Sequence, residues 1–170
     1  MADGVSFQIQ GLDALLGKLE NLKYETKKKG GRYALRKAAQ LVRDAARENA
    51  KRIDDPTSPE KISANIVERW NSRLNRRTGD LGFRIGVLGG ARDYSAYGEI
   101  TTGKKATTNP GGDTFYWRFV EFGTQFVPAR PFIRPALESN IGAATDEFVK
   151  QYERVIDRAI KTSKKKGTVI

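Results

Sequence analysis

The sequence predicts an α+β fold, in which a small antiparallel sheet of about three or four strands packs against two long helices. Three observations lead to this class. Residues 32–53 and 135–160 carry apolar side chains at steps of three and four, which is the helical period. Short segments between them alternate apolar and polar side chains, as half-buried strands do. A long loop, residues 89–114, separates two of the expected strands.

The length predicts a single domain. A chain of 170 residues is long enough to bury roughly 70% of the surface that its unfolded form exposes. We assign residues 1–160 to this domain and residues 161–170 to a flexible basic tail. Apolar runs stay short of the roughly 18 residues that a membrane span needs, and the N-terminus lacks the pattern of a secretory signal. We therefore expect a soluble protein with no membrane contact.

The first part of the chain predicts a strand and two helices. Residues 5–9 alternate as a strand, and residues 12–22 place leucines on one helical stripe. The pair Gly30-Gly31 is expected to break or loosen the chain before the long helix at 32–53. That helix has a narrow apolar seam that lets another element approach closely, formed by Leu35, Ala38, Leu41, Val42, Ala45, Asn49 and Ile53.

The middle of the chain predicts the sheet. Prolines 56 and 59 end the long helix, and residues 62–70 are expected to run from a turn into a strand. Residues 73–80 are interpreted as a basic turn and 81–88 as a second strand. Residues 114–122, "TFYWRFVEF", are predicted to form a central strand because both of their alternating faces are apolar.

Residues 123–132 are predicted to form a rigid strap between that strand and the final helix. Gly123 and Thr124 end the strand, while Pro128 and Pro131 fix an extended backbone. Phe132 and Ile133 then anchor the strap through apolar contacts. Pro135 falls in the first turn of the final helix, where a missing N–H costs nothing.

The residue types argue against catalysis. Cysteine and histidine are both absent, which removes thiolate chemistry, the commonest general base and the commonest metal ligand. Residues 98–105, "GEITTGKK", come near a phosphate-binding loop, but Lys105 stands where the hydroxyl should be. Glu121, between two apolar residues, is expected to pair with Arg130 or Arg134 rather than to act as a catalytic acid. We expect no enzyme activity and no cofactor or metal.

The charge predicts an anionic partner or a solvated face. The net charge is +11, and residues 23–52 hold eleven Lys or Arg against three Asp or Glu. Residues 158–166 add five basic residues and no acidic one. A basic surface attracts DNA, RNA or an acidic protein, although an exposed helix face gives the same count. The loop at 89–114 is either a tolerated insertion or an arm that contacts a neighbouring subunit or lines a channel.

Residues 120–137, "VEFGTQFVPARPFIRPAL", resemble the signature of a tail-component family of long-tailed bacteriophages and prophages, which includes the minor tail protein Z of phage lambda. The family pattern is Glu, an aromatic residue and Gly-Thr, followed by Pro-Ala-x-Pro-Phe, an apolar residue and Arg-Pro-Ala. The chain matches it at Glu121, Phe122, Gly123, Thr124, Pro128, Ala129, Pro131, Phe132, Arg134, Pro135 and Ala136.

The resemblance implies a structural virion protein of the neck, also described as a head–tail joining or tail-completion protein. Such a protein forms an oligomeric ring at the head–tail junction, of six copies or alternatively twelve, and joins the tail tube to the head. Its implied partners are copies of itself, head-closure or connector proteins, and tail tube or tail terminator proteins. Before assembly it resides in the host cytoplasm.

Two groups of residues are candidates for these contacts. Subunit or partner contacts are expected at Glu121, Phe122, Gly123, Thr124, Arg130, Phe132, Ile133 and Arg134. Contacts with DNA in a channel, or with an acidic docking partner, are expected at Arg73, Arg76, Arg77, Lys104 and Lys105. The alternative function is a sequence-nonspecific nucleic-acid-binding protein, supported by a pI near 9.9 but by no recognised binding motif.

Overall fold

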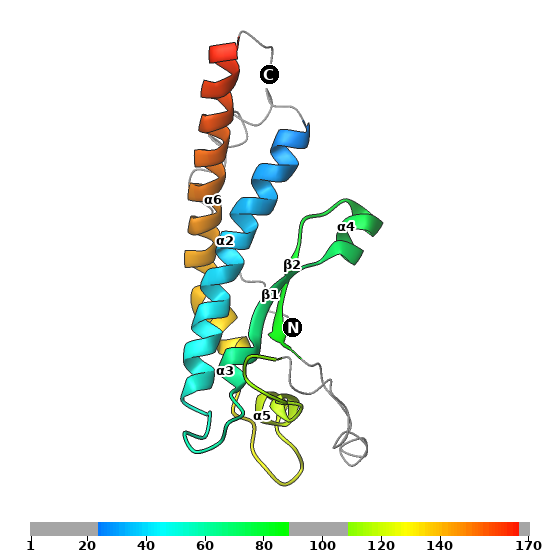
Figure 1. The fold of residues 1–170 in the computed structure, drawn as a ribbon, viewed down its shortest axis with the longest axis vertical. Coiled ribbons are helices and arrows are strands. Elements are labelled where there is room, and N and C mark those ends of the chain that lie inside the picture. Colours follow the sequence, from blue (N-terminus) through cyan, green and yellow to red (C-terminus); the bar gives the residue numbers. More distant parts are fainter. Residues whose placement is uncertain (1–23, 89–108, 167–170) are drawn as a thin grey trace, which may run out of the picture. The chain divides into compact units, whose positions relative to one another are not determined.

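A computed structural model describes residues 24–88 and 109–166 of the chain. Its elements are α2 (Tyr24–Lys51), α3 (Ile62–Asn65), β1 (Ile66–Trp70), α4 (Ser72–Thr78), β2 (Phe83–Val87), α5 (Trp117–Phe122) and α6 (Ile133–Lys166) (Figure 1). The expected mixture of two long helices and a small antiparallel sheet is confirmed. Within the described ranges the sheet has two strands, β1 and β2, rather than three or four. The strand and helix predicted before residue 23 lie outside these ranges.

The described chain divides into two compact units. The first contains residues 24–40, 70–83 and 141–166, and the second contains residues 41–69 and 109–140 together with 84–88. Each unit has its own apolar core, so each is described by itself. The assignment of one domain to residues 1–160 stays a prediction. In the ranges that the structure covers, no helix combines the length and the apolar character needed to cross a lipid bilayer.

In the first unit, the N-terminal part of α2 lies beside the C-terminal part of α6 (Figure 1). Ala34 of α2 packs in a buried cluster with Tyr152 and Ile156 of α6. The Tyr152 hydroxyl donates a hydrogen bond to the Lys27 carbonyl at 2.9 Å. Burial raises the pKa of this phenol above its usual range, so the hydroxyl stays a donor.

Of the two effects expected at Gly30-Gly31, a break in the chain was wrong, because α2 continues through both residues. A Cβ atom on Gly30 would lie 3.0 Å from Tyr152 Cε2 and 3.1 Å from Val155 Cγ1. Gly30 therefore allows α2 and α6 to pack closely. The stabilisation from this packing outweighs the unfavourable backbone entropy of glycine in a helix.

The alanine-rich seam of α2 is confirmed at Ala38 and Val42, but its other buried positions lie one residue away from the predicted ones. The buried positions are Ala34, Ala38, Val42, Ala46 and Ala50. Leu35 and Leu41, which were expected on the seam, are only half buried. The smallest side chains of α2 thus lie on the face against which other elements pack.

The core of the second unit gathers the start of α6, the end of α2, α3 and the sheet. Phe132, Ile62 and Ile66 are fully buried there together with Ala46 and Ala50. Full burial of a side chain the size of Phe132 contributes about 3 kcal/mol of hydrophobic stabilisation. Arg47 donates to the Ile66 carbonyl at 2.9 Å, which ties α2 to the start of β1.

The sheet is a hairpin of β1 and β2 with a fixed register. The Leu88 N–H donates to the Asn65 carbonyl at 2.8 Å, and the Asn71 N–H donates to the Gly82 carbonyl at 2.9 Å. These two bonds frame the ladder and place each β1 residue opposite one β2 residue. Trp70 is therefore opposite Phe83, and their rings meet edge to face with centroids 5.3 Å apart.

The connection inside this hairpin is helix α4 rather than the predicted basic turn. The Asn71 side chain accepts from the Leu74 N–H at 3.2 Å and so caps the first turn. Gly79 closes the helix with φ of 81°, a left-handed conformation that favours glycine. The sequence pattern "NSRLNRRTG" contains both signals, so a short capped helix could have been expected.

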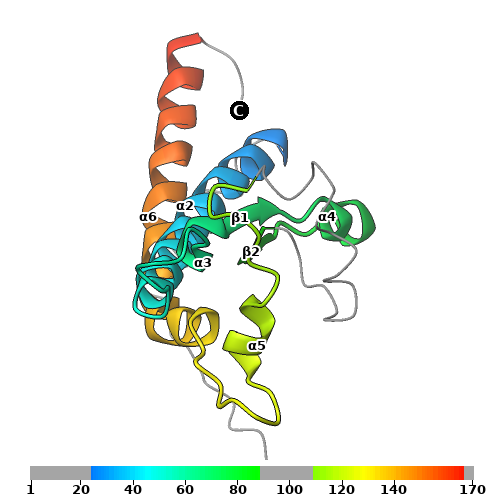
Figure 2. The same cartoon turned by 60° about the horizontal axis from the view of Figure 1, so that its bottom comes forward.

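The predicted central strand at residues 114–122 was also wrong, because residues 117–122 form helix α5. Figure 2 shows the chain leaving α5, passing through the strap and entering α6. Trp117, Val120 and Glu121 are the covered residues of this turn, whereas Arg118 and Phe122 are exposed. This spacing of three and four is helical, and one helical turn brings Glu121 to the start of α6.

Substitution of the two glycines Gly30 and Gly142 by alanine tests the close packing between α2 and α6. Alanine is favoured over glycine in a helix by about 1 kcal/mol. We expect Gly142→Ala to increase the free energy of unfolding, because nothing lies within 4 Å of the added Cβ. Gly30→Ala is expected to decrease it, since Tyr152 is held by its hydrogen bond and cannot move away. Urea denaturation followed by circular dichroism measures both; equal stabilisation by the two substitutions would contradict this account.

Candidate functional site

The buried carboxylate of Glu121 holds the start of α6. Glu121 is 1% exposed, and its carboxylate accepts three backbone hydrogen bonds from consecutive residues. The donors are the N–H groups of Phe132 at 2.7 Å, Ile133 at 3.0 Å and Arg134 at 3.2 Å. These are the groups that a helix leaves without partners in its first turn. The negative charge also lies at the positive end of the helix dipole, which stabilises it further.

Pro135 completes this cap. It is the third residue of α6 and has no N–H, so the first turn holds no donor beyond those that Glu121 binds. Arg134 adds a charged contact, with its Nε donating to the carboxylate at 3.3 Å and its Nη2 to the Glu121 carbonyl at 2.9 Å. Of the two arginines expected to pair with Glu121, Arg134 is the one that does so.

The strap leaves α5 through a tight turn. Gly123 has φ of 75°, and an added Cβ would lie 2.8 Å from the Ala129 nitrogen. Any other residue here would be strained. The Thr124 hydroxyl accepts from the N–H groups of Phe126 at 3.2 Å and Val127 at 3.0 Å. The Thr124 N–H in turn donates to the Val127 carbonyl at 2.9 Å, so the tip of the strap is held by its own hydrogen bonds.

The far end of the strap is anchored in the core. Phe132 is fully buried, and its carbonyl accepts from the Asn49 side chain at 3.2 Å. Ile133 packs partly against the same core. Between these anchors and the tip, the Arg130 N–H donates to the Val120 carbonyl at 2.8 Å. The predicted rigidity of the strap thus comes from hydrogen bonds as well as from its prolines.

The strap and the adjoining end of α5 project large apolar side chains into solvent. Phe126 is 85% exposed, Phe122 is 60% exposed and Val127 is 56% exposed. The Arg134 guanidinium lies over the Phe122 ring, 5.1 Å from its centroid. Exposed aromatic residues on a rigid loop are typical of protein–protein contact sites. Phe126 and Val127 are missing from the predicted contacts, because the sequence alone does not show whether an apolar residue of a connector is exposed.

The predicted contact residues thus divide into two groups. Glu121, Gly123, Thr124, Phe132 and Ile133 lie inside the chain or shape its backbone. Phe122, Arg130 and Arg134 reach the surface. Their contact with a partner stays a prediction, and the structure shows that the buried members of this segment hold its exposed members in place.

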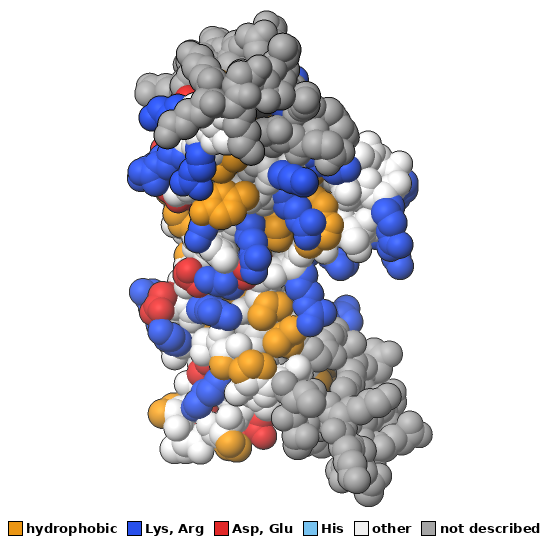
Figure 3. Space-filling model, turned by 45° about the horizontal axis from the view of Figure 1, so that its top comes forward, with side chains coloured by type: hydrophobic (Ala, Val, Ile, Leu, Met, Phe, Trp, Pro, Cys, Tyr) orange, Lys and Arg blue, Asp and Glu red, His pale blue; other side chains and the backbone are white. Residues whose placement is uncertain are grey.

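Three of the five predicted basic residues lie in the part of the chain that the structure describes. Arg73, Arg76 and Arg77 are exposed on α4. Figure 3 shows that Lys and Arg side chains spread widely over the face in view, with few acidic side chains among them. Lys104 and Lys105 lie outside the described residues, as does most of the loop at 89–114.

The end of that loop is fixed to α3 by Asn65, which is fully buried. Its amide donates to the Gly112 carbonyl at 2.9 Å and to the Thr114 hydroxyl at 2.8 Å. The Asn65 side-chain oxygen, Oδ1, accepts from the Gly111 N–H at 2.8 Å. A Cβ on Gly111 would lie 2.0 Å from the Lys61 carbonyl oxygen, so the chain passes here too closely for any side chain.

The described residues show neither a metal-binding cluster nor an unsatisfied buried polar group. No group of three or more Asp, Glu, Cys or His residues lies close enough in these ranges to hold an ion. Every buried side-chain nitrogen or oxygen in the same ranges has a hydrogen-bond partner. Glu121 is one of these partnered groups, because its carboxylate accepts hydrogen bonds from the start of α6 and from Arg134.

Replacement of Glu121 by glutamine tests the cap. The amide keeps one acceptor oxygen but loses the negative charge and places an NH₂ group against backbone donors. We expect the free energy of unfolding to fall by about 2–3 kcal/mol. Glu138→Gln is the matched control, because Glu138 is exposed on α6, the helix that Glu121 caps, and should change stability by less than about 0.5 kcal/mol. Equal denaturation midpoints for the two variants would rule out the cap.

Comparison with known proteins identifies the family. The family model for HK97-gp10-like bacteriophage tail components matches residues 13–123, which is well over half of the chain. The match ends at Gly123, so it covers α5 and Glu121 but not the rest of the strap. Searches of curated proteins and of solved structures gave no match. On the strength of the family match, the chain belongs to the HK97-gp10-like family of bacteriophage tail components.

Proposed function

We propose that this tail component forms an oligomeric ring at the head–tail junction and joins the tail tube to the head, as a neck or tail-completion protein. Its role is structural rather than enzymatic. Its partners are copies of itself, head-closure or connector proteins, and tail tube or tail terminator proteins. The protein is made in the host cytoplasm and incorporated into the virion.

The observation that carries this proposal is the rigid, exposed strap. A cap with three hydrogen bonds and a fully buried Phe132 hold the strap against the core, while Phe126 stands almost entirely in solvent. An apolar projection of this kind disfavours an isolated chain, because it leaves apolar surface in water. It favours a chain that covers the projection by assembly. Family membership supplies the setting, a phage tail.

The exposed arginines of α4 support a second contact. We infer that Arg73, Arg76 and Arg77 meet the phosphate backbone of phage DNA in the assembled ring, without reading its sequence. The alternative function, a free nucleic-acid-binding protein, uses the same residues but requires no assembly. The two functions differ in whether the isolated chain binds DNA.

Ring formation is tested on the purified full chain. We expect native mass spectrometry and negative-stain electron microscopy to show closed rings of one copy number, six or twelve, alone or after addition of tail tube or head-closure protein. Antibody labelling of virions should place the protein at the head–tail junction. Infectious virions that lack the polypeptide would refute the proposed function.

The DNA contact is tested by salt titration of binding. Assembled rings should bind duplex DNA with an affinity that falls as salt rises, whereas the isolated chain should bind negligibly at physiological salt. Replacing Arg73, Arg76 and Arg77 together by glutamine should reduce the slope of log affinity against log salt by about three. The control is the triple glutamine variant of the exposed α6 residues Lys150, Arg154 and Arg158, which should leave the slope unchanged. Tight, steeply salt-dependent binding by the isolated chain would favour the alternative function.

A further inference from the structure

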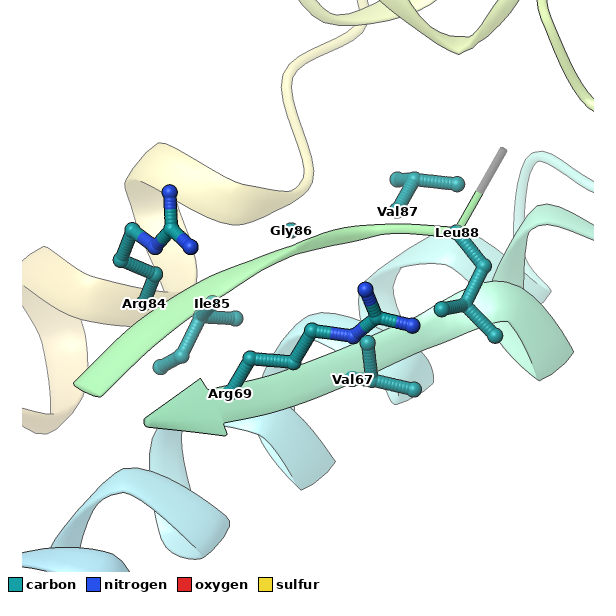
Figure 4. Close-up of a pocket in the computed structure, with 7 residues that line it drawn as sticks. All are labelled: Val67, Arg69, Arg84, Ile85, Gly86, Val87 and Leu88. Atoms are coloured by element: carbon teal, nitrogen blue, oxygen red, sulfur yellow. The ribbon is translucent and has the colours of Figure 1, made fainter. Parts of the chain in front are cut away.

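The outer face of the hairpin carries an open hollow of about 350 Å³. It is lined by Val67, Arg69, Arg84, Ile85, Gly86, Val87 and Leu88. Figure 4 shows Arg69 on β1 and Arg84 on β2, with Val67, Gly86 and Leu88 farther along the two strands. The hollow therefore combines an apolar floor with two guanidinium groups.

Gly86 is responsible for part of this hollow. The register of the hairpin places it opposite Val67, so one side of that cross-strand pair has no side chain. A Cβ on Gly86 would have nothing within 4 Å, and Gly86 is not among the glycines with positive φ. Neither space nor backbone geometry within the described chain requires glycine here. A glycine inside a regular strand weakens it and often marks the close approach of another molecule.

The two arginines are an unusual pair. Arg69 and Arg84 are directly opposite each other across the strands, where like charges destabilise a sheet. No ion pair or hydrogen bond of either guanidinium exists in the part of the chain that the structure covers. A group with negative electrostatic potential would stabilise such a pair, and the face of an aromatic ring is one such group.

The same chain presents an aromatic side chain suited to this hollow. Phe126 is 85% exposed at the tip of the strap, and the Thr124 hydroxyl holds the backbone on either side of it. No strap residue lines the hollow of its own chain. The chain already pairs guanidinium groups with rings elsewhere, as Arg134 does over Phe122 at 5.1 Å and Arg32 over Trp70 at 4.3 Å.

We propose that Phe126 of one copy inserts into the Arg69–Arg84 hollow of a second copy. A ring requires two different surfaces on each subunit, one that projects and one that receives. The strap tip and the hollow are two such surfaces, with matching apolar character and matching guanidinium–aromatic chemistry. This inference rests on the proposed ring, and it names the contact that closes it. An acidic partner protein or DNA in the hollow is the competing occupant, which the experiment distinguishes.

Cross-linking of engineered cysteines tests the contact, since the chain has no cysteine of its own. The variants are Phe126→Cys, Gly86→Cys and, as a matched control, Gly142→Cys, another glycine whose added Cβ meets nothing within 4 Å. With a short bismaleimide, the mixture of Phe126→Cys and Gly86→Cys should give about tenfold more dimer than Phe126→Cys with Gly142→Cys. The double variant Phe126→Cys/Gly86→Cys should give a ladder of higher oligomers.

Filling the hollow provides an independent measurement. Gly86→Leu should retain the fold, because a Cβ added at Gly86 meets nothing within 4 Å. A copy with Phe126→Cys should cross-link to a second copy with Arg69→Cys. The cross-linked dimer should be lost when the second copy also carries Gly86→Leu, because the leucine fills the hollow. Contact between two copies of a chain with net charge +11 should strengthen when salt is added, whereas docking of an acidic protein or DNA should weaken.

Two outcomes would overturn the inference. The first is cross-linking no greater than in the control pair, both in the free chain and in virions carrying the variants. The second is Phe126→Cys cross-linking to itself as efficiently as to Gly86→Cys. If virions contain the protein at the neck and the pair still fails to cross-link, the contact is refuted and the proposed function stands. If virions contain no copy of the protein, the proposed function fails whatever the cross-linking shows.

Discussion

The exposed strap depends on one interaction, the hydrogen bonding of the Glu121 carboxylate to the start of α6. This carboxylate binds the first N–H groups of α6 and so fixes where that helix begins. Because Glu121 belongs to α5, the same bonds set the distance between the two ends of the strap. The strap then has little freedom, and its tip, with Phe126, is presented in one arrangement. A buried charge is costly unless it is fully hydrogen-bonded, and here it is.

The sequence was sufficient for the long elements. Apolar residues at steps of three and four predicted α2 and α6, since that pattern repeats often enough to be distinctive, and alternation predicted β2. The strand β1 was expected from Ile66, Val67 and Trp70, whose residue types suit a strand. The segment at 117–122 was missed because one helical turn is too short to establish a period. Its aromatic residues made both alternating faces apolar, and only Glu121 signalled otherwise. Gly30-Gly31 was misread because local propensity opposes a helical glycine, and the compensating contact with Tyr152 is distant in sequence.

The sequence indicated that the strap is a constrained segment, while the contacts predicted for it stay predictions. The prolines and Phe132 marked the strap as rigid, and the structure supplies the hydrogen bonds behind that rigidity. The exposure of Phe126 could not be read from sequence, because an apolar residue in a connector is as consistent with burial as with exposure. The hollow beside Gly86 was equally hidden, since it depends on the pairing register of two strands. Family membership gave the setting, a phage tail, without the contacts.

The three hydrogen bonds at Glu121 also have a mechanical consequence. They share one acceptor group, so they resist a pull on α6 together and fail together, rather than one after another. A force along that helix passes to α5 through the side chains of Glu121 and Arg134 and to the interior through Phe132. The junction should therefore yield abruptly at a threshold force, with little stretching beforehand, and remain stiff below it.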